Sequence, residues 1–346
     1  MRTILSTLAL LGGLFAAVLA LGVLTAKWER PWPLVTQLGY RGVQMQQLDN
    51  RARLNATLTL ASNVAPDPLD PADAGGKPAS EVYKNVKVLG TLTENQFNRT
   101  MLAITQWVAP EQGCEYCHNV ENLADDGKYT KVVARRMLQM TKNINANWVT
   151  HVGTTGVTCY TCHRGNPVPK FIWFDQAAET RPQGFAGYRN GSNAPSASVG
   201  LTSLPYNPFS TLLDQQQPIR VEATRALATS APEPGIQTTE KTYALMMSIS
   251  QALGVNCTFC HNTRQFADWG QSTPQRATAW YGIRMVRDLD MHYLDPLKAT
   301  WPANRLGPLG DGPKAYCATC HQGQPKPLNG AKMHKDYLEL DAATLN

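Results

Sequence analysis

Residues 114–118 read Cys-Glu-Tyr-Cys-His, and the pattern recurs as Cys-Tyr-Thr-Cys-His at 159–163, Cys-Thr-Phe-Cys-His at 257–261 and Cys-Ala-Thr-Cys-His at 317–321. The chain has 8 cysteines, and these four segments contain all of them. Two cysteines separated by two residues and followed at once by histidine are typical of c-type haem attachment. The thiols add across the haem vinyl groups, and the histidine then lies beneath the iron as its proximal ligand.

The four motifs predict four covalently bound c-type haems. The predicted attachment residues are Cys114, Cys117, Cys159, Cys162, Cys257, Cys260, Cys317 and Cys320, and the predicted proximal ligands are His118, His163, His261 and His321. Other uses of the cysteines explain less. A redox-active pair needs only one copy and no histidine, two zinc sites would leave four histidines unexplained, and a two-residue spacing suits general disulfide stapling poorly.

The composition excludes few classes of protein. The chain has 346 residues, of which 43% are hydrophobic, and a formal net charge of +6. That mild charge, without a basic run, gives no support to nucleic-acid binding. The 23 prolines and 26 glycines indicate much irregular structure.

The N-terminal segment from Ile4 to Ala26 is almost wholly apolar and is flanked by Arg2 and Lys27. Its length of about 23 residues is enough to span a bilayer. A cleaved signal peptide is the alternative, but Leu24-Thr25-Ala26 fits a small-x-small cleavage site poorly. We expect an uncleaved transmembrane anchor. Because c-type haem is attached outside the cytoplasm, the motifs are expected on the periplasmic side.

Two parts of the chain match each other. Met101-Leu-Ala-Ile-Thr-Gln matches Met246-Met-Ser-Ile-Ser-Gln, Cys-Glu-Tyr-Cys-His-Asn at 114–119 matches Cys-Thr-Phe-Cys-His-Asn at 257–262, and Arg-Met at 136–137 matches Arg-Met at 284–285. This indicates an internal duplication of a two-haem unit. Helical apolar spacing at 96–108, 131–148, 241–253 and 275–289 places a helix before each motif.

These signals predict a mainly α fold with extensive irregular loops, that of a multihaem cytochrome c. We expect 1–26 to form the anchor, 27–90 an extended N-terminal arm, 91–165 the first haem pair, 166–235 a loop-rich connector, 236–325 the second haem pair and 326–346 a C-terminal tail without a motif.

The residues alone leave the second axial ligand of each iron open. An electron carrier closes both axial positions, and methionine raises the potential relative to histidine. Met101 and Met246 occupy the same repeat position, although a methionine is ordinarily core packing. Met137 precedes the second motif, and Met285 is its repeat counterpart. The histidines outside the motifs are His151, His292 and His334.

From about residue 27 to 330 the chain resembles the tetrahaem cytochrome subunit of purple-bacterial photosynthetic reaction centres. The resemblance is carried by the uneven motif spacing, by the methionines and His151, and by Trp-Tyr-Gly-Ile-Arg-Met-Val-Arg-Asp-Leu-Asp at 280–290. It implies that Met101, Met137 and Met246 ligate the first, second and third haems and His151 the fourth. Repeat logic alone would instead give Met285 to the fourth haem. Family members often carry a lipidated cysteine, whereas this chain has no cysteine before Cys114.

The resemblance implies a periplasmic electron-transfer role, not an enzyme. The subunit would associate with the reaction-centre core subunits and pass electrons from a soluble donor, a cytochrome c or a high-potential iron–sulfur protein, to the photo-oxidised special pair. A respiratory or quinol-linked carrier and, less well, a multihaem reductase are the alternatives. An acidic stretch around the first motif, which could steer a basic donor, contains Glu111, Glu115, Glu121, Asp125 and Asp126.

Overall fold

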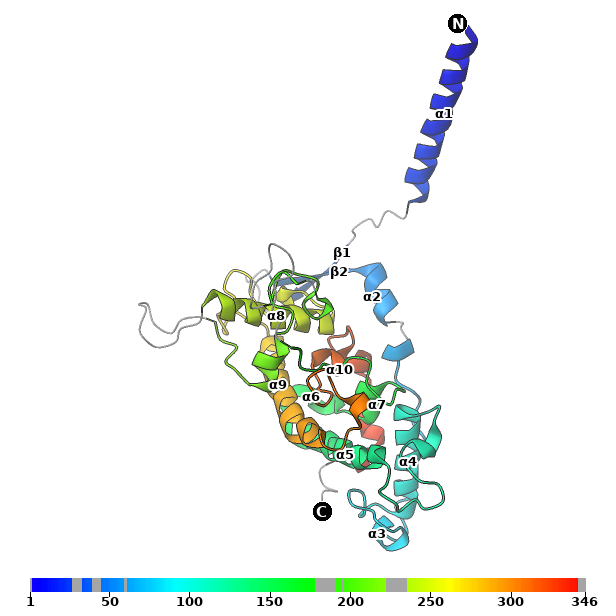
Figure 1. Cartoon of the computed structure of the whole chain (residues 1–346), viewed down its shortest axis with the longest axis vertical. Coiled ribbons are helices and arrows are strands. Elements are labelled where there is room, and N and C mark those ends of the chain that lie inside the picture. Colours follow the sequence, from blue (N-terminus) through cyan, green and yellow to red (C-terminus); the bar gives the residue numbers. More distant parts are fainter. Residues whose placement is uncertain are drawn as a thin grey trace, which may run out of the picture.

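The structure is a computed structural model that describes residues 2–26, 33–38, 45–58, 61–177, 191–194, 196–221 and 235–341. It is mainly helical, as expected (Figure 1). Within these residues the strands β1 (Pro33–Leu38) and β2 (Met45–Asn50) form a two-stranded antiparallel sheet, with Pro33 opposite Asn50. This hairpin and α2 (Arg51–Leu58) lie in the segment predicted to be an extended arm.

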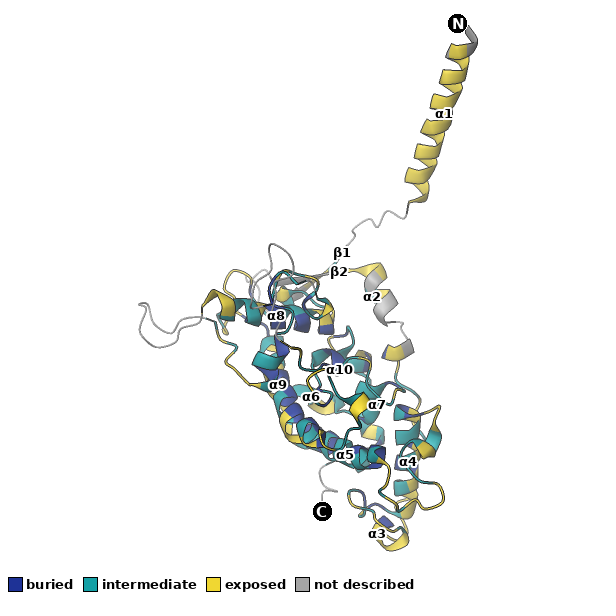
Figure 2. Cartoon of the chain, in the orientation of Figure 1, coloured by how far each residue is buried: buried dark blue, intermediate teal, exposed yellow. Residues whose placement is uncertain are grey.

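The helix α1 (Arg2–Thr25) contains one apolar stretch, Ser6–Thr25, that is long enough to cross a membrane by length and composition. Its described side chains are all exposed, and it stands apart from the globular body (Figure 2). Apolar side chains such as Leu10 and Leu14 would be unfavourable in water, so the helix is compatible with membrane anchoring.

The first half of the body is built on α4 (Glu94–Val108) and α5 (Tyr129–Asn147), close to the predicted helices 96–108 and 131–148. Helix α4 begins at a capping box in which Thr93 and Gln96 bond each other's backbone N–H groups. It buries Ala103 and Trp107 on one face. The short helices α3 (Ala79–Val82), α6 (Val149–Val152) and α7 (Cys159–His163) complete this half.

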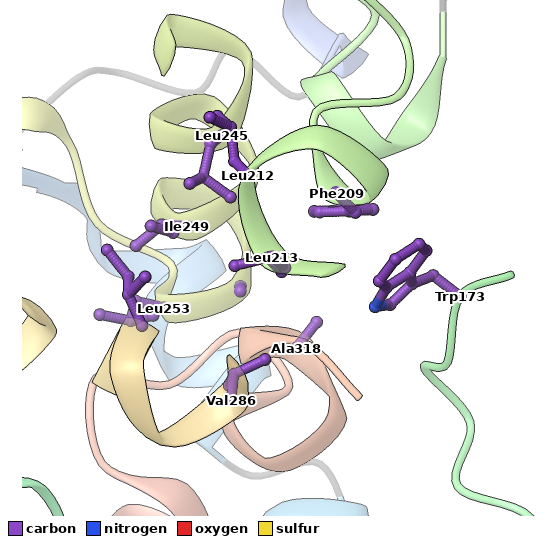
Figure 3. Close-up of a cluster of buried hydrophobic side chains, with 11 residues drawn as sticks. Trp173, Phe209, Leu212, Leu213, Leu245, Ile249, Leu253, Val286 and Ala318 are labelled. Atoms are coloured by element: carbon purple, nitrogen blue, oxygen red, sulfur yellow. The ribbon is translucent and has the colours of Figure 1, made fainter. Parts of the chain in front are cut away.

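The second half is built on α8 (Ile236–Leu253) and α9 (Pro274–Leu289), where helices were predicted at 241–253 and 275–289, and ends in α10 (Cys317–His321). Leu245, Ile249 and Leu253 recur every four residues and form one face of α8. Figure 3 shows this face packed against Leu212 and Leu213 of the connector. The same cluster includes Val286 of α9 and Ala318 of α10, so it joins the helices of this half.

Short 3-10 and π turns link these elements. They are η1 (Ala61–Asn63), η2 (Gly113–Tyr116), η3 (Gly153–Thr155), η4 (Ala197–Val199), η5 (Ser210–Asp214), η6 (Cys257–Phe259), η7 (Asp290–Leu294), η8 (Asp295–Leu297), η9 (Ala303–Arg305), η10 (Pro327–Gly330), η11 (Met333–Asp336) and η12 (Leu338–Leu340).

The C-terminal tail returns to the first half. Met333, Tyr337 and Leu340 are buried in one cluster with Trp107 of α4. The Tyr337 ring meets the Trp107 ring edge-on at 4.5 Å, and its hydroxyl accepts a 2.9 Å hydrogen bond from the Leu69 backbone N–H. The guanidinium of Arg99 lies 4.1 Å above the same ring. The tail is therefore part of the core around the first two motifs.

The motifs are spread along the long axis of the body. Figure 1 shows α8 at the end nearest α1, α10 and α7 in the middle, and α4 with α3 at the opposite end. The two halves of the sequence meet in the middle, where α10 contacts α7, and this brings the fourth motif beside the second.

Candidate functional site

Five histidines share one geometry. Each directs Nδ1 at a backbone carbonyl oxygen: His118 at Leu123 (3.2 Å), His163 at Asn166 (2.9 Å), His261 at Phe266 (3.0 Å), His321 at Gln324 (2.8 Å) and His151 at Thr278 (2.9 Å). A carbonyl oxygen can only accept a hydrogen bond, so the proton is on Nδ1. Nε2 then keeps the lone pair that a metal needs, and the ring is held in orientation.

The other two histidines lie beside carboxylates. His292 Nδ1 lies 2.7 Å from Asp288 Oδ1, and His334 Nε2 lies 2.8 Å from Asp341 Oδ1. In both, a ring nitrogen lies beside a carboxylate oxygen and not beside a backbone carbonyl. The sequence left three histidines outside the motifs as candidates, and this geometry sets His151 apart from His334.

Burial keeps these groups neutral. It lowers the pKa of His118, His163, His261 and His151, and it lowers that of His321 to about 4. A neutral imidazole is the form that ligates a metal.

Four of the cysteine thiols are also kept neutral by burial. It raises the pKa of Cys117, Cys159 and Cys260 to about 11 and that of Cys317 to about 12. A redox-active pair requires the opposite shift, towards the thiolate, so this environment does not favour that alternative.

A cavity of about 500 Å³ lies between α4 and α5. The predicted ligands and attachment residues that line it are Met101, Cys114, Cys117, His118, Met137, Cys159 and His163. It thus brings together all four residues predicted for the first haem, with three of the four predicted for the second. A large apolar cavity lined by two attachment thiols, an imidazole and a thioether fits a covalently bound haem.

The imidazole of His151 lies beside that of His321, the histidine of the fourth motif. Their ring centroids are 6.1 Å apart. Two metal–nitrogen bonds of about 2 Å, with the ring radii added, span roughly 6 Å. One iron can therefore lie between the two imidazoles. Met285, the ligand that repeat logic would give, instead packs in a buried cluster with Ile144 and Leu289.

At the third motif the two predicted axial ligands are Met246 and His261. Met246 is half-buried against the core cluster of α8, while the neighbouring Met247 faces Gly200. His261 lies beside the Phe266 ring at 5.4 Å. The pairing of Met246 with His261 stays a prediction.

Cys162 and Cys320 form a disulfide in the structure, with Cα atoms 4.3 Å apart. A sulfur in a disulfide cannot carry a thioether at the same time. Haem attachment at both motifs requires these two sulfurs as thiols, and their role as attachment residues stays a prediction. Their closeness places α7 directly beside α10.

The two halves repeat several hydrogen bonds. The N–H after each of α7 and α10, in Gly165 and Gly323, donates over 2.8 Å to Trp107 in α4 and to Ala252 in α8. The hydroxyls of Thr130 and Thr273 donate to the carbonyls of Tyr116 and Phe259. The short helices α7 and α10 each end in a left-handed residue, Arg164 and Gln322.

The predicted acidic stretch divides into two kinds of residue. Asp126 is paired with Lys87, Lys131 and Arg135 at 3.4, 3.2 and 2.9 Å. Hydrogen bonds from Arg135 and Asn85 hold the pKa of its carboxyl well below the usual range. The remaining members are exposed: Glu111, Glu115, Glu121 and Asp125.

Two contributors to the site were not found from the sequence. Thr278 offers its carbonyl to His151, and Gly282, one turn later in α9, leaves room for that imidazole. An isolated glycine inside a predicted helix is a signal of close packing and could have indicated Gly282.

The helical fold, the four motifs and the imidazole geometry define a multihaem c-type cytochrome. A family model described as the photosynthetic reaction centre cytochrome C subunit matches residues 29–341. The chain belongs to this family.

The similarity to individual relatives extends over most of the chain. It is 53% identical over 320 residues to the photosynthetic reaction center cytochrome c subunit of Rubrivivax gelatinosus, covering 92% of this chain and 87% of that protein. The corresponding protein of Thermochromatium tepidum is 48% identical over 325 residues, which is 94% of this chain and 79% of the relative. That of Roseobacter denitrificans is 44% identical, over 88% and 84%.

Family membership confirms the predicted class. The chain is an electron-transfer protein of photosynthetic reaction centres and not an enzyme in the usual sense. It implies covalently bound c-type haem and association with the reaction-centre core, and the apolar α1 agrees with a membrane-associated subunit.

Proposed function

We propose that this chain relays single electrons from a soluble periplasmic donor through four covalent c-type haems to the photo-oxidised special pair. When bound, each haem supplies an iron that cycles between its ferrous and ferric states. The protein would hold the rings at fixed spacing and set the potentials through axial ligands and local charge. The observation that carries the proposal is the order α8, α10, α7 and α4 along the long axis of the body, with α8 at the end nearest the apolar helix α1 (Figure 1). Helices α7 and α10 contain the second and fourth motifs, and α4 and α8 precede the first and third.

The proposed axial pairs are Met101 with His118, Met137 with His163, Met246 with His261, and His151 with His321. The shared cavity supports the first pair and the closeness of the second. The 6.1 Å between the imidazoles supports the fourth. The family resemblance supports the third.

The proposed order of the sites is first, second, fourth, third. The first and second motifs line one cavity. The second and fourth are joined at Cys162 and Cys320. The fourth adjoins α8, which precedes the third motif, because Gly323 bonds the Ala252 carbonyl at 2.8 Å. Electrons would therefore leave through the third site and enter through the first.

An internal duplication of a two-haem unit explains the repeated hydrogen bonds. Trp107 and Ala252 are 145 positions apart, the same separation as between Met101 and Met246. The carbonyls of Trp107 and Ala252 each accept a hydrogen bond from the glycine N–H that follows a motif helix. We propose that 91–165 and 236–325 are the two copies, joined by the connector 166–235. Residues 27–90 are the N-terminal arm and 326–346 the tail.

The docking site proposed for the donor is the exposed surface around the first motif. The four exposed carboxylates there would attract a basic cytochrome c. Asp126 would contribute less to this attraction, because three cations of the same chain pair with it. Val120 and Leu123, both more than half exposed, would serve a high-potential iron–sulfur protein that docks by apolar contact.

The segment 1–26 is proposed to stay on the mature chain and to hold the body on the periplasmic side of the membrane. The length of α1 and the missing lipid-acceptor cysteine support this.

Light-induced absorption changes in membranes test the proposal. We expect a flash to oxidise haem of this chain and added reduced donor to re-reduce it. A respiratory or quinol-linked carrier would show no flash response. A haem that binds carbon monoxide in the reduced wild-type protein would instead favour a reductase. The mass added to the polypeptide should equal four haems.

A further inference from the structure

The backbone of helix α9 lies directly against the imidazole of His151. Thr278 and Gly282 are one helical turn apart and face the imidazole of α6. His151 Nδ1 donates to the Thr278 carbonyl oxygen over 2.9 Å. Gly282 is buried in the middle of the helix, where glycine is less favourable than alanine. Its backbone is helical, so no unusual conformation requires glycine there.

The space beside Gly282 is filled by His151. A Cβ atom on residue 282 would lie 2.5 Å from Cε1, 2.9 Å from Nδ1 and 3.1 Å from Nε2 of His151. The first two distances are shorter than carbon contacts allow. Any side chain at 282 would therefore displace the imidazole or the helix. In the first half, Ala134 holds the position that matches Gly282, in the helix that carries Met137.

The missing side chain also opens the carbonyl to the imidazole. In a helix the Cα–Cβ bond leans towards the N-terminus, so a side chain covers the turn before it. A side chain at 282 would cover the Thr278 carbonyl, which already accepts from the helical N–H of residue 282. With glycine, the second lone pair of that oxygen can receive the proton of His151 Nδ1.

We propose that Gly282 is a positioning residue: it lets His151 lie against α9, with Nδ1 on Thr278 and Nε2 directed at the iron of the fourth site. This inference rests on the proposed ligation by His151. Gly282 would touch the ligand and not the haem. It would determine that the fourth iron has two imidazole ligands and hence a lower potential than a methionine-ligated one.

Substitution Gly282→Ala tests this in the full chain with its haems. We expect one of the four ferric haems to change from low to high spin, the reduced protein to bind carbon monoxide at that haem, and its potential to rise. The control is Leu289→Ala on the same helix, which removes buried packing without touching His151. It should lower thermal stability and leave all four spectra unchanged.

A second pair of variants removes the steric conflict, in case Gly282→Ala does not fold. His151→Gly should create one open haem that free imidazole restores to low spin. Adding Gly282→Ala to His151→Gly should weaken imidazole binding about tenfold or more, because the new Cβ occupies the site of the ring.

The outcomes distinguish ligation of the haem by His151 from positioning of His151 by Gly282. If His151→Gly leaves four low-spin haems, the ligation by His151 is wrong and the role of Gly282 fails with it. If His151→Gly opens a haem but imidazole binds equally well with Gly282 and with Ala at 282, only the positioning role is overturned. Four low-spin haems at unchanged potentials in a folded Gly282→Ala protein would overturn it as well.

Discussion

Replacement of Tyr337 measures how strongly the C-terminal tail holds the first two motifs. The ring is 2% exposed and meets Trp107 at 4.5 Å, and the hydroxyl accepts from the Leu69 N–H over 2.9 Å. Tyr337→Phe removes only that acceptor and should reduce the free energy of unfolding by about 1 kcal/mol. Tyr337→Ala also removes the buried ring and should cost about 4–5 kcal/mol.

These losses are large compared with the usual stability of a domain, about 5–15 kcal/mol. The melting temperature of the phenylalanine variant should fall by about 2 °C and that of the alanine variant by about 10 °C. Denaturant unfolding of the detergent-solubilised chain gives both values, with tryptophan fluorescence recovering as the rings move away from the haems.

The matched control is Leu338→Ala, since Leu338 is 61% exposed and adjacent in sequence. It should change stability by no more than about 0.5 kcal/mol. Equal costs for Leu338→Ala and Tyr337→Ala would refute the assignment of the tail to the core. A phenylalanine variant as unstable as the alanine variant would instead attribute the whole effect to the hydroxyl.

Three further predictions concern ligation, pH and docking. His151→Met should raise one haem potential by on the order of 0.1 V, within the roughly 0.8 V that axial ligands can span, as redox titration will show. Burial raises the pKa of the Asp290 carboxyl well above 3.8. The carboxyl therefore contributes to the free energy of unfolding below pH 3.8, and this contribution is lost as the pH rises through its folded-state pKa. Asp290→Asn should remove that loss and make the free energy of unfolding less dependent on pH. Glu111→Lys with Glu115→Lys should slow flash-induced re-reduction by a basic cytochrome about tenfold at low salt, because each reversal changes the attraction at about 10 Å by roughly 0.8 kcal/mol, and salt should shrink the difference.

Each of these has a clear contrary result. Four unchanged potentials in His151→Met, with one shifted in Met285→Leu, would return the fourth ligand to the repeat position. A pH profile of Asp290→Asn that parallels the wild type would exclude the buried carboxyl as its source. Equal re-reduction rates at low ionic strength would remove the acidic surface from the docking site.

The local signals in the sequence predicted the helices well and the long-range contacts poorly. Apolar spacing placed the helix around Met101 within two residues of its observed start, because a half-buried helix repeats its pattern locally. The hairpin of β1 and β2 was missed, since its alternation is short and lies among turn-forming residues. The burial of Tyr337 against Trp107 joins residues 230 positions apart, and no local pattern records that.

The candidate site shows the same division. The C-x-x-C-H spacing is enough to predict the attachment residues, because one short helix or turn carries all the chemistry. The partner of His321 is instead 170 positions away, and only the family resemblance indicated His151. An isolated glycine in a predicted helix signals close packing at Gly282, but only the fold shows that the group packed against it is the imidazole of His151.

The contact of His151 with His321 and the hydrogen bond from Arg164 to the Cys320 carbonyl tie the first half of the chain to the second. A ribosome finishes the first half long before His321 emerges, so these contacts can form only after almost the entire polypeptide has been made. The same exchange bears on ancestry. Under the proposed duplication, one copy would supply a side chain to the other, so neither copy could be deleted without damaging its twin, and the duplication would become a one-way step.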